Sequence, residues 1–224
     1  MTDLPILLTI AVLGGTGKEG KGLVYRWAKA GYHVHIGSRD EVKALTAATE
    51  VMALLEGEAF VDGMFNLEAA QNADIIVLTV PYAAHRTTLE MVKDALKGKI
   101  LVDVTVPLIP PKVTTVQMPA AGSAAQEARE ILGMDTHVCA AFHNISHENL
   151  IDDEYVECDV LVTGTNKEAR AETIKLVEAA GFSGWDAGPL ENSVVVEGLT
   201  SVLIGINKKY GSTHAGIKIT GVEK

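Results

Sequence analysis

Residues 9–20 read T-I-A-V-L-G-G-T-G-K-E-G, a short apolar run that leads directly into a cluster of glycines. The run predicts a buried strand, and the residues that follow have the spacing of a helix. Between them, residues 15–20 match the pattern G-x-G-x-x-G. In this context the glycines allow a tight turn and close approach of the backbone to a pyrophosphate at the helix N-terminus. The stretch therefore predicts a dinucleotide site, whose contacts with the phosphates we assign to Gly14, Gly15, Thr16, Gly17, Lys18 and Gly20.

Apolar runs alternate with helical patterns along most of the chain, and this alternation predicts an α/β fold. Because the strands are apolar throughout, they fit a parallel sheet that is covered by helices on both faces. We expect a Rossmann-type doubly wound domain over residues 1–142 and a small C-terminal α/β cap domain over residues 143–224. The expected strands are 9–13, 34–37, 74–80, 100–104, 138–142, 160–163 and 184–186. The expected helices are 18–30, 43–55, 83–96, 123–132, 167–180 and a final one capped by Asn192 or Ser193.

The end of the second strand indicates which dinucleotide binds. An NAD-specific site places Asp or Glu there to accept from the ribose hydroxyls. This chain instead reads Gly37-Ser38-Arg39-Asp40, and a hydroxyl beside a guanidinium suits the 2′-phosphate of NADP(H). Lys43, one helical turn further on, offers a third contact. A shift of one residue would make Asp40 the ribose acceptor, so the prediction of NADP(H) depends on the position of Arg39.

A second ligand is expected at the carboxyl ends of the other strands, where open parallel sheets bind their ligands. A loop of eighteen residues, 105–122, holds four of the seven prolines and converges there. The lining is apolar with few titratable groups, which suits hydride transfer between stacked rings from which water is excluded. The residues that we assign to this part of the site are Val80, Pro81, Tyr82, Thr105, Val106, Pro107 and His143.

The titratable residues near these strand ends give weaker signals. His143 either polarises a substrate or hydrogen-bonds to backbone, so it is the one possible catalytic residue. His85 and Arg86 begin a helix near the cleft, where they either meet an anionic ligand or form a solvated helix start, and we expect the second. Cys139, His143 and His147 are spaced four apart, but a strand at 138–142 would not bring them together, so we expect no metal.

Composition limits the classes of partner. The formal net charge of −10 argues against nucleic acid, which needs a basic face. The sequence shows no signal peptide and no stretch of about 18 apolar residues that would cross a membrane. The two cysteines form no CxxC pair and suggest no disulfide framework. We therefore expect a cytoplasmic protein that binds small molecules.

The chain resembles the F420H2:NADP oxidoreductases, the NADPH-dependent reductases of the deazaflavin coenzyme F420. The resemblance covers nearly the whole chain. Its most specific part is the block D-A-G-P-L at 186–190, followed by the final helix. The other matching stretches are V-L-G-G-T-G at 12–17, G-S-R at 37–39, L-T-V-P at 78–81, N-S at 192–193, E-G-L-T at 197–200 and G-I-K at 216–218.

The resemblance implies an oxidoreductase that transfers a hydride reversibly between NADP(H) and coenzyme F420, with no covalent intermediate. In the family, a Rossmann domain and a small C-terminal domain hold the deazaflavin ring near the nicotinamide between them. Residues at the family's NADP-phosphate positions are Thr16, Ser38, Arg39 and Lys43. Residues where the family has its pocket are Pro81, Tyr82, Val106, Pro107 and His143.

Two other functions fit the same residues. One is an NADPH-dependent reductase of another acceptor, such as a flavin, a ferric complex or an imine. The other is a non-catalytic NADP-sensing protein, which would need no second pocket of aromatic size. Whatever the function, the strongly apolar final helix packs either on its own domain or against a partner, and a symmetric homodimer is the default expectation.

Overall fold

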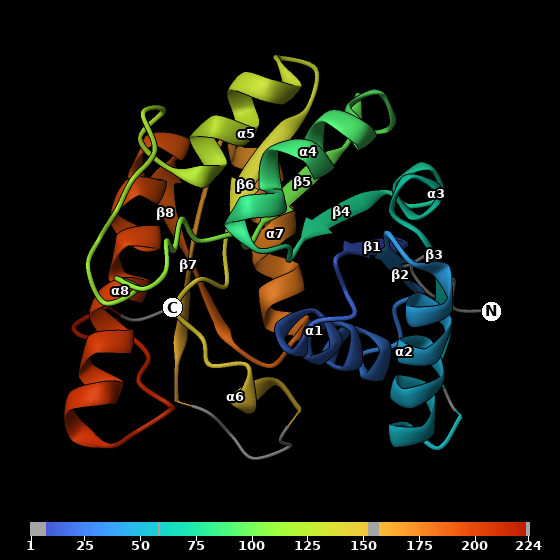
Figure 1. Ribbon diagram of the computed structural model, residues 1–224, viewed down its shortest axis with the longest axis horizontal. Coiled ribbons are helices and arrows are strands. Elements are labelled where there is room, and N and C mark those ends of the chain that lie inside the picture. Colours follow the sequence, from blue (N-terminus) through green and yellow to red (C-terminus); the bar gives the residue numbers. More distant parts are fainter. Residues whose placement is uncertain (1–7, 58, 152–156, 223–224) are drawn as a thin grey trace.

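The computed structural model describes residues 8–57, 59–151 and 157–222 and contains one eight-stranded sheet (Figure 1). The strand order is β3-β2-β1-β4-β5-β6-β7-β8. All neighbouring strands are parallel except β6 and β7. The chain therefore has the α/β, Rossmann-type architecture that the sequence predicts. The strands are β1 (Ile10–Leu13), β2 (Val34–Ser38), β3 (Val61–Phe65), β4 (Ile75–Leu78), β5 (Ile100–Asp103), β6 (His137–Ala140), β7 (Asp159–Gly164) and β8 (Ser183–Pro189).

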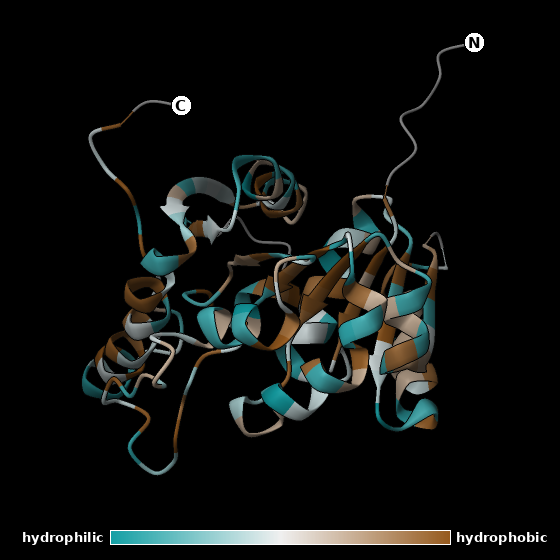
Figure 2. Ribbon diagram, turned by 90° about the horizontal axis from the view of Figure 1, so that it is seen from above, coloured by the Kyte–Doolittle hydropathy of each residue, from teal (hydrophilic) through white to brown (hydrophobic). Residues whose placement is uncertain are grey.

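Helices cover both faces of the sheet, and the apolar strands lie between them (Figure 2). One buried cluster joins the sheet to α1 (Lys18–Lys29), α2 (Glu41–Leu54) and α7 (Lys167–Ala179). The other joins it to α3 (Asn66–Gln71), α4 (Tyr82–Val92), the 3-10 helix η1 (Lys93–Leu96) and α5 (Ala124–Leu132). Full burial of each large aliphatic side chain contributes about 1.5–3 kcal/mol to these two layers.

Trp27 on α1 connects the N-terminal and C-terminal halves of the chain, on the face of the sheet that α1, α2 and α7 cover. Its side chain is completely buried, and its indole Nε1 donates to the Leu176 carbonyl on α7 at 2.8 Å. Its ring also makes an edge contact with Phe142, with 5.8 Å between ring centroids. Because β7 and β8 extend the same sheet beyond β6, residues on both sides of position 143 share one core. The division into domains at 142/143 stays a prediction.

The sequence analysis missed several short elements. β3 and α3 were not anticipated, because V-D-G-M-F has no clear alternation and α3 has only six residues. The other missed elements are α6 (Glu148–Ile151) and the 3-10 helix η2 (Leu190–Asn192). The expected strand 138–142 begins and ends earlier, at His137 and Ala140. Residues 105–122 form the expected loop without helix or strand.

The expected cap of the last helix is also wrong. Helix α8 (Ser193–Tyr210) begins without a side-chain cap at Asn192, whose amide instead donates to the Ala187 carbonyl at 2.7 Å. The hydroxyl of Ser193 donates to the Leu190 carbonyl at 2.6 Å and lies 2.7 Å from that of Ser123. Both polar side chains therefore form hydrogen bonds that connect the start of α8 to neighbouring segments.

Candidate functional site

The glycine loop joins β1 to α1 at the carboxyl edge of the sheet. Gly14 has a φ of +75°, a left-handed conformation that glycine adopts without strain. Its N–H donates to the Gly37 carbonyl at 3.0 Å and lies 3.3 Å from the side-chain oxygen of Asn66. Gly17 precedes α1 in an extended conformation and makes no side-chain cap. The first N–H groups of α1 are thus not engaged by a capping side chain, which suits an anionic ligand.

Gly20 allows α1 to pack directly against the loop and β4. A Cβ at this position would lie 2.7 Å from the Gly15 Cα and 2.8 Å from the Thr79 hydroxyl oxygen. Either distance is too short for a side chain, so only glycine fits between these two segments. Nearby, burial raises the pKa of the partly buried Glu19 carboxyl to about 8. The first turn of α1 therefore carries less negative charge near neutral pH than its sequence suggests.

The end of β2 presents the residues that we expect to recognise the 2′-phosphate. Ser38 is buried, and its hydroxyl oxygen accepts from the Asp40 N–H at 3.1 Å. Arg39 and Lys43 are exposed. Asp40 caps α2, because its carboxylate accepts from the Lys43 N–H at 3.2 Å. That carboxylate is therefore already engaged at the start of a helix, whereas the Arg39 side chain faces solvent.

The carboxyl ends of β4, β5 and β6 lie side by side, because these strands are neighbours in parallel register. The loops that leave them are also hydrogen-bonded to one another. The Thr105 hydroxyl donates to the Val80 carbonyl at 3.4 Å, and the Ala141 N–H donates to the Asp103 carbonyl at 3.3 Å. The seven residues assigned to the second part of the site follow the ends of these three adjacent strands, at one edge of the sheet. Among them, Pro107 and His143 are buried and Pro81 is exposed.

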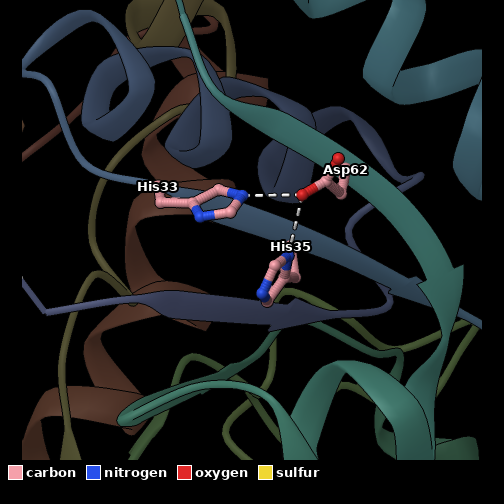
Figure 3. Close-up of side chains that lie close together, drawn as sticks. All are labelled: His33, His35 and Asp62. Atoms are coloured by element: carbon pink, nitrogen blue, oxygen red, sulfur yellow. Dashed lines mark hydrogen bonds and ion pairs between the residues drawn. The ribbon is translucent and has the colours of Figure 1, made fainter.

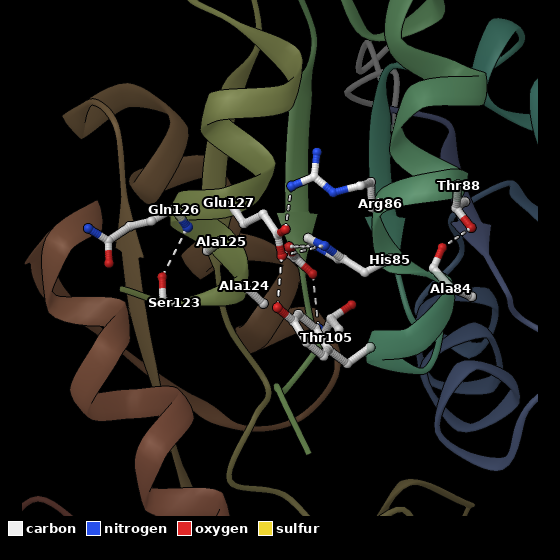
Figure 4. Close-up of polar contacts among 12 residues, drawn as sticks. Ala84, His85, Arg86, Thr88, Thr105, Ser123, Ala124, Ala125, Gln126 and Glu127 are labelled. Carbon is white, nitrogen blue, oxygen red and sulfur yellow. Dashed lines mark hydrogen bonds and ion pairs between the residues drawn. The ribbon is translucent and has the colours of Figure 1, made fainter. Parts of the chain in front are cut away.

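A buried polar network lies beneath this edge (Figure 4). The His85 Nε2 lies 2.7 Å from the Asp103 Oδ2, and both side chains are completely buried. Glu127 on α5 accepts from the Tyr82 hydroxyl at 3.0 Å and from the Arg86 guanidinium at 2.6 Å. The expected solvated helix start is therefore wrong for His85, and the expectation of few titratable groups is wrong for this edge. The sequence feature that could have indicated this network is Asp103, an acidic residue that ends an otherwise apolar strand.

His143 follows β6 in an apolar environment. Burial lowers its pKa to about 4, although the nearby Asp103 carboxylate opposes the shift. Neither ring nitrogen has a hydrogen-bond partner among the described residues. The preceding residue, Phe142, has a φ of +67°, a strained conformation for a bulky side chain. The imidazole is thus neutral at physiological pH, and the Asp103 backbone lies close to its ring.

Helix α8 closes the site from the C-terminal side. Its Thr200 hydroxyl donates to the His143 carbonyl at 2.8 Å, and the Asn144 amide donates to the Val196 carbonyl at 3.1 Å. Gly198 lets the proline-rich loop approach, since a Cβ there would lie 3.3 Å from the Met118 Cε. The C-terminal helix, the proline-rich loop and the segment after β6 thus form one packed unit.

Glu197 is a functional candidate that the sequence analysis did not single out. It is completely buried, and its two carboxylate oxygens accept from the N–H groups of Ala124 at 2.7 Å and Ala125 at 3.1 Å. Burial raises its pKa to about 8, and the Asp103 charge adds to that shift, whereas the two N–H bonds oppose it. A carboxyl from α8 therefore caps α5, which no local pattern in the sequence could indicate.

Comparison with known proteins identifies the family. The model of a family described as "NADP oxidoreductase coenzyme F420-dependent" matches residues 9–107. A curated relative from Methanocaldococcus jannaschii, named F420-dependent NADP reductase, is 40% identical over 224 residues, covering 96% of this chain and all of the relative. A relative of the same name from Methanothermobacter marburgensis is 41% identical, covering 96% of this chain and 99% of the relative. The chain belongs to the F420-dependent NADP reductase family.

Solved structures support the same fold. A protein from Arthrobacter sp. FB24 superimposes with a TM-score of 0.80 at 24% identity and covers 96% of this chain and 100% of that one. A pyrroline carboxylate reductase from Plasmodium falciparum gives a TM-score of 0.59 at 13% identity, covering 91% and 64%. No helix within the described part of this reductase-family chain is long and apolar enough to cross a membrane.

Proposed function

We propose that the chain transfers a hydride reversibly between NADP(H) and coenzyme F420. The observation that carries the proposal is the near-complete overlap, at about 40% identity, with relatives named F420-dependent NADP reductase. The arrangement at the carboxyl edge supports it, because the glycine loop after β1 and the ends of β4, β5 and β6 lie at the same edge of one sheet.

NADP(H) would lie across the carboxyl ends of β1 and β2. Its pyrophosphate would meet the N-terminus of α1, with Gly14, Gly15, Gly17 and Gly20 giving the backbone room and Thr16 and Lys18 supplying side-chain donors. Its 2′-phosphate would be held by the Ser38 hydroxyl and the guanidinium of Arg39, with Lys43 close by in sequence. The positive charges of Arg39 and Lys43 would locally offset the overall charge of −10.

The second ring would stack on the nicotinamide near the ends of β4, β5 and β6. Val80, Pro81, Tyr82, Thr105, Val106 and Pro107 would shape this part of the site and exclude water, which favours direct hydride transfer. A neutral His143 can donate or accept one hydrogen bond without adding charge, so it would orient a ring rather than act as a strong acid. Reduction of the deazaflavin also takes up one proton for each hydride.

An activity assay tests this function. Purified protein with NADPH and oxidised F420 should bleach the visible absorbance of the coenzyme, and NADH in place of NADPH should be much slower. Reduction of riboflavin or FMN without reduction of F420 would favour the alternative reductase. Tight NADP(H) binding without turnover of any acceptor would instead favour a non-catalytic sensor.

We also propose a symmetric homodimer that forms through α8. Val195, Val202 and Ile206 are apolar side chains with exposures of 64%, 47% and 41% on this helix. Their spacing puts them along one side of the helix, and a second copy of the chain would cover them. A location in the cytoplasm fits this function.

Light scattering after gel filtration tests the dimer. Wild type should have twice the chain mass of 23.8 kDa. Val202→Asp should shift the mass toward that of one chain, while Val42→Asp, at an equally apolar residue exposed on α2, should leave it unchanged. Monomeric wild-type protein, or equal effects of the two substitutions, would contradict the proposal.

A further inference from the structure

Two histidines and an aspartate meet at the amino end of strands β2 and β3 (Figure 3). His33 immediately precedes β2 and His35 lies within it, so the two side chains point to the same face of the sheet. Asp62 on β3 is the register partner of His35. Within the described residues, β3 is the edge strand of the sheet.

The three side chains are close enough to share one ion. The Asp62 Oδ2 lies 2.6 Å from the His33 Nε2 and 3.5 Å from the His35 Nδ1. All three potential ligand atoms lie within 4.8 Å of one another. In a tetrahedral zinc site, metal–ligand distances of about 2.0–2.2 Å place ligand atoms about 3.3–3.6 Å apart. Small rotations of the exposed His33 and Asp62 side chains would therefore complete such a geometry.

His35 gives a second and independent indication of a ligand. Its side chain is only 8% exposed, yet its Nδ1 has no hydrogen-bond partner among the described residues. That nitrogen faces the carboxylate of Asp62, as Figure 3 shows. A buried polar nitrogen without a partner costs about 1–3 kcal/mol, and native structures pair nearly all such atoms with protein, water or an ion. An ion between this nitrogen and the Asp62 carboxylate would supply the missing partner.

The surroundings fit this role. On its other side the His35 ring interacts with the backbone carbonyl of Asn72, and ligating histidines usually present their second nitrogen to such a group. Glu68, on the neighbouring α3, adds negative charge near the ring. The exposures of His33 and Asp62, 44% and 56%, leave a path by which an ion could enter.

We propose that His33, His35 and Asp62 bind a divalent transition-metal ion of the zinc class. Two imidazole nitrogens and one carboxylate suit Zn²⁺, Ni²⁺ or Co²⁺ rather than Mg²⁺ or Ca²⁺, which prefer oxygen ligands. Water would fill the remaining coordination positions. The ion would join the edge strand β3 to β2 and so stabilise that side of the sheet. The site does not depend on the proposed function, because it lies at the opposite end of β2 from Ser38 and Arg39.

Titration with Zn²⁺ tests the site. Protein freed of its affinity tag and treated with a chelator should bind one equivalent of Zn²⁺ by calorimetry, and its Tm should rise with Zn²⁺ concentration. His33→Ala and Asp62→Asn should each weaken binding at least about 10-fold, since even loss of an outer-shell partner costs 10- to 100-fold. His214→Asn is the matched control, because it removes another exposed histidine, 3.5 Å from Glu148, and should bind Zn²⁺ like wild type.

Three results would overturn the proposal: no stoichiometric binding by the wild type, unchanged affinity in both site variants, or displacement of Zn²⁺ by an equal concentration of Mg²⁺. Circular dichroism of the metal-free variants checks that each remains folded. F420 and NADPH turnover, measured on the same samples, should not require the metal, so failure of the metal site and failure of the proposed activity would be distinguished.

Discussion

The Nε2 atom of His85 lies 2.7 Å from the Oδ2 atom of Asp103, and both side chains are completely buried. The second carboxylate oxygen of Asp103 accepts from the Thr105 N–H at 3.0 Å. One carboxylate therefore holds both the start of α4 and the first residues of the proline-rich loop. This pair fixes two of the three strand ends from which the second part of the candidate site is built.

Replacing Asp103 with Ala should lower the free energy of unfolding by about 3–5 kcal/mol, because it breaks a buried ion pair and leaves its partner unsatisfied. The Thr105 N–H would lose its acceptor as well. Asp135→Ala removes an exposed carboxylate and should change the stability by less than about 0.5 kcal/mol. Urea denaturation of the three proteins measures the difference, and similar midpoints for the two variants would contradict this account.

The stability contributed by His85 should depend on pH. Burial lowers the pKa of this imidazole, but the charges of Asp103 and Glu127 outweigh burial and raise the pKa above its ordinary value. The folded protein thus holds a proton that the unfolded chain releases above about pH 6.5. The stability difference between wild type and His85→Gln should be constant below that pH and shrink as the pH rises through the raised pKa. Denaturation curves from pH 5 to pH 9 provide the measurement, and a difference that grows with pH would contradict the assignment.

The sequence predicts those parts of the molecule that local patterns determine. The turn between β1 and α1 and the end of β2 lie where the sequence predicts them, because each depends on a few consecutive residues. Asn66 and Glu197 were missed, because each acts on a residue more than fifty positions away and lies in a segment with an ordinary helical pattern. His85 was misjudged because its contacts are with Asp103 on β5 and Glu127 on α5, which no local pattern indicates.

Arg39→Ala should change the preference between NADPH and NADH. Loss of a charge-assisted hydrogen bond costs about 1.5–3 kcal/mol, so the KM for NADPH should rise roughly 10- to 100-fold. The KM for NADH, which has no 2′-phosphate, should change little. Lys93→Ala serves as the control, since it removes an exposed positive charge from η1 at the far end of α4. Equal losses with the two dinucleotides would disprove the assignment of Arg39 to the 2′-phosphate.

Glu197→Gln should remove a pH dependence that the wild type shows. In the wild type the pKa of this carboxyl rises on folding from 4.5 to about 8, so folding takes up a proton between those values. The free energy of unfolding therefore falls as the pH rises through that window. The Gln variant should lack this fall with pH, although its amide oxygen can accept only one of the two backbone N–H bonds.

A comparison of Glu197→Ala with Glu197→Gln separates the effect of the charge of this residue from the effect of its hydrogen bonds. The N–H groups of Ala124 and Ala125 would lose their acceptor, at about 1–3 kcal/mol for each donor left buried and unsatisfied. The Ala variant should thus be less stable than the Gln variant at every pH. Parallel stability curves for wild type and Glu197→Gln would show that the raised pKa is wrong.

Gly20→Ala should destabilise the fold and Gly17→Ala should not, but both should weaken binding of the dinucleotide. The Cβ added at Gly20 would meet the Gly15 Cα at 2.7 Å, so we expect a loss of about 1–3 kcal/mol of stability and a displaced loop. At Gly17 the nearest atom to an added Cβ is the Gly14 carbonyl oxygen at 3.7 Å, and the backbone φ of −75° suits alanine. Gly17→Ala should therefore fold with wild-type stability.

The two variants should both bind NADPH more weakly, for different reasons. In Gly20→Ala the loop no longer packs on α1 as the pyrophosphate requires, whereas in Gly17→Ala the exposed methyl group occupies space at the helix N-terminus. Thermal unfolding without ligand and NADPH titration by fluorescence separate the two effects. If Gly17→Ala bound NADPH as tightly as wild type, the pyrophosphate could not lie against the start of α1.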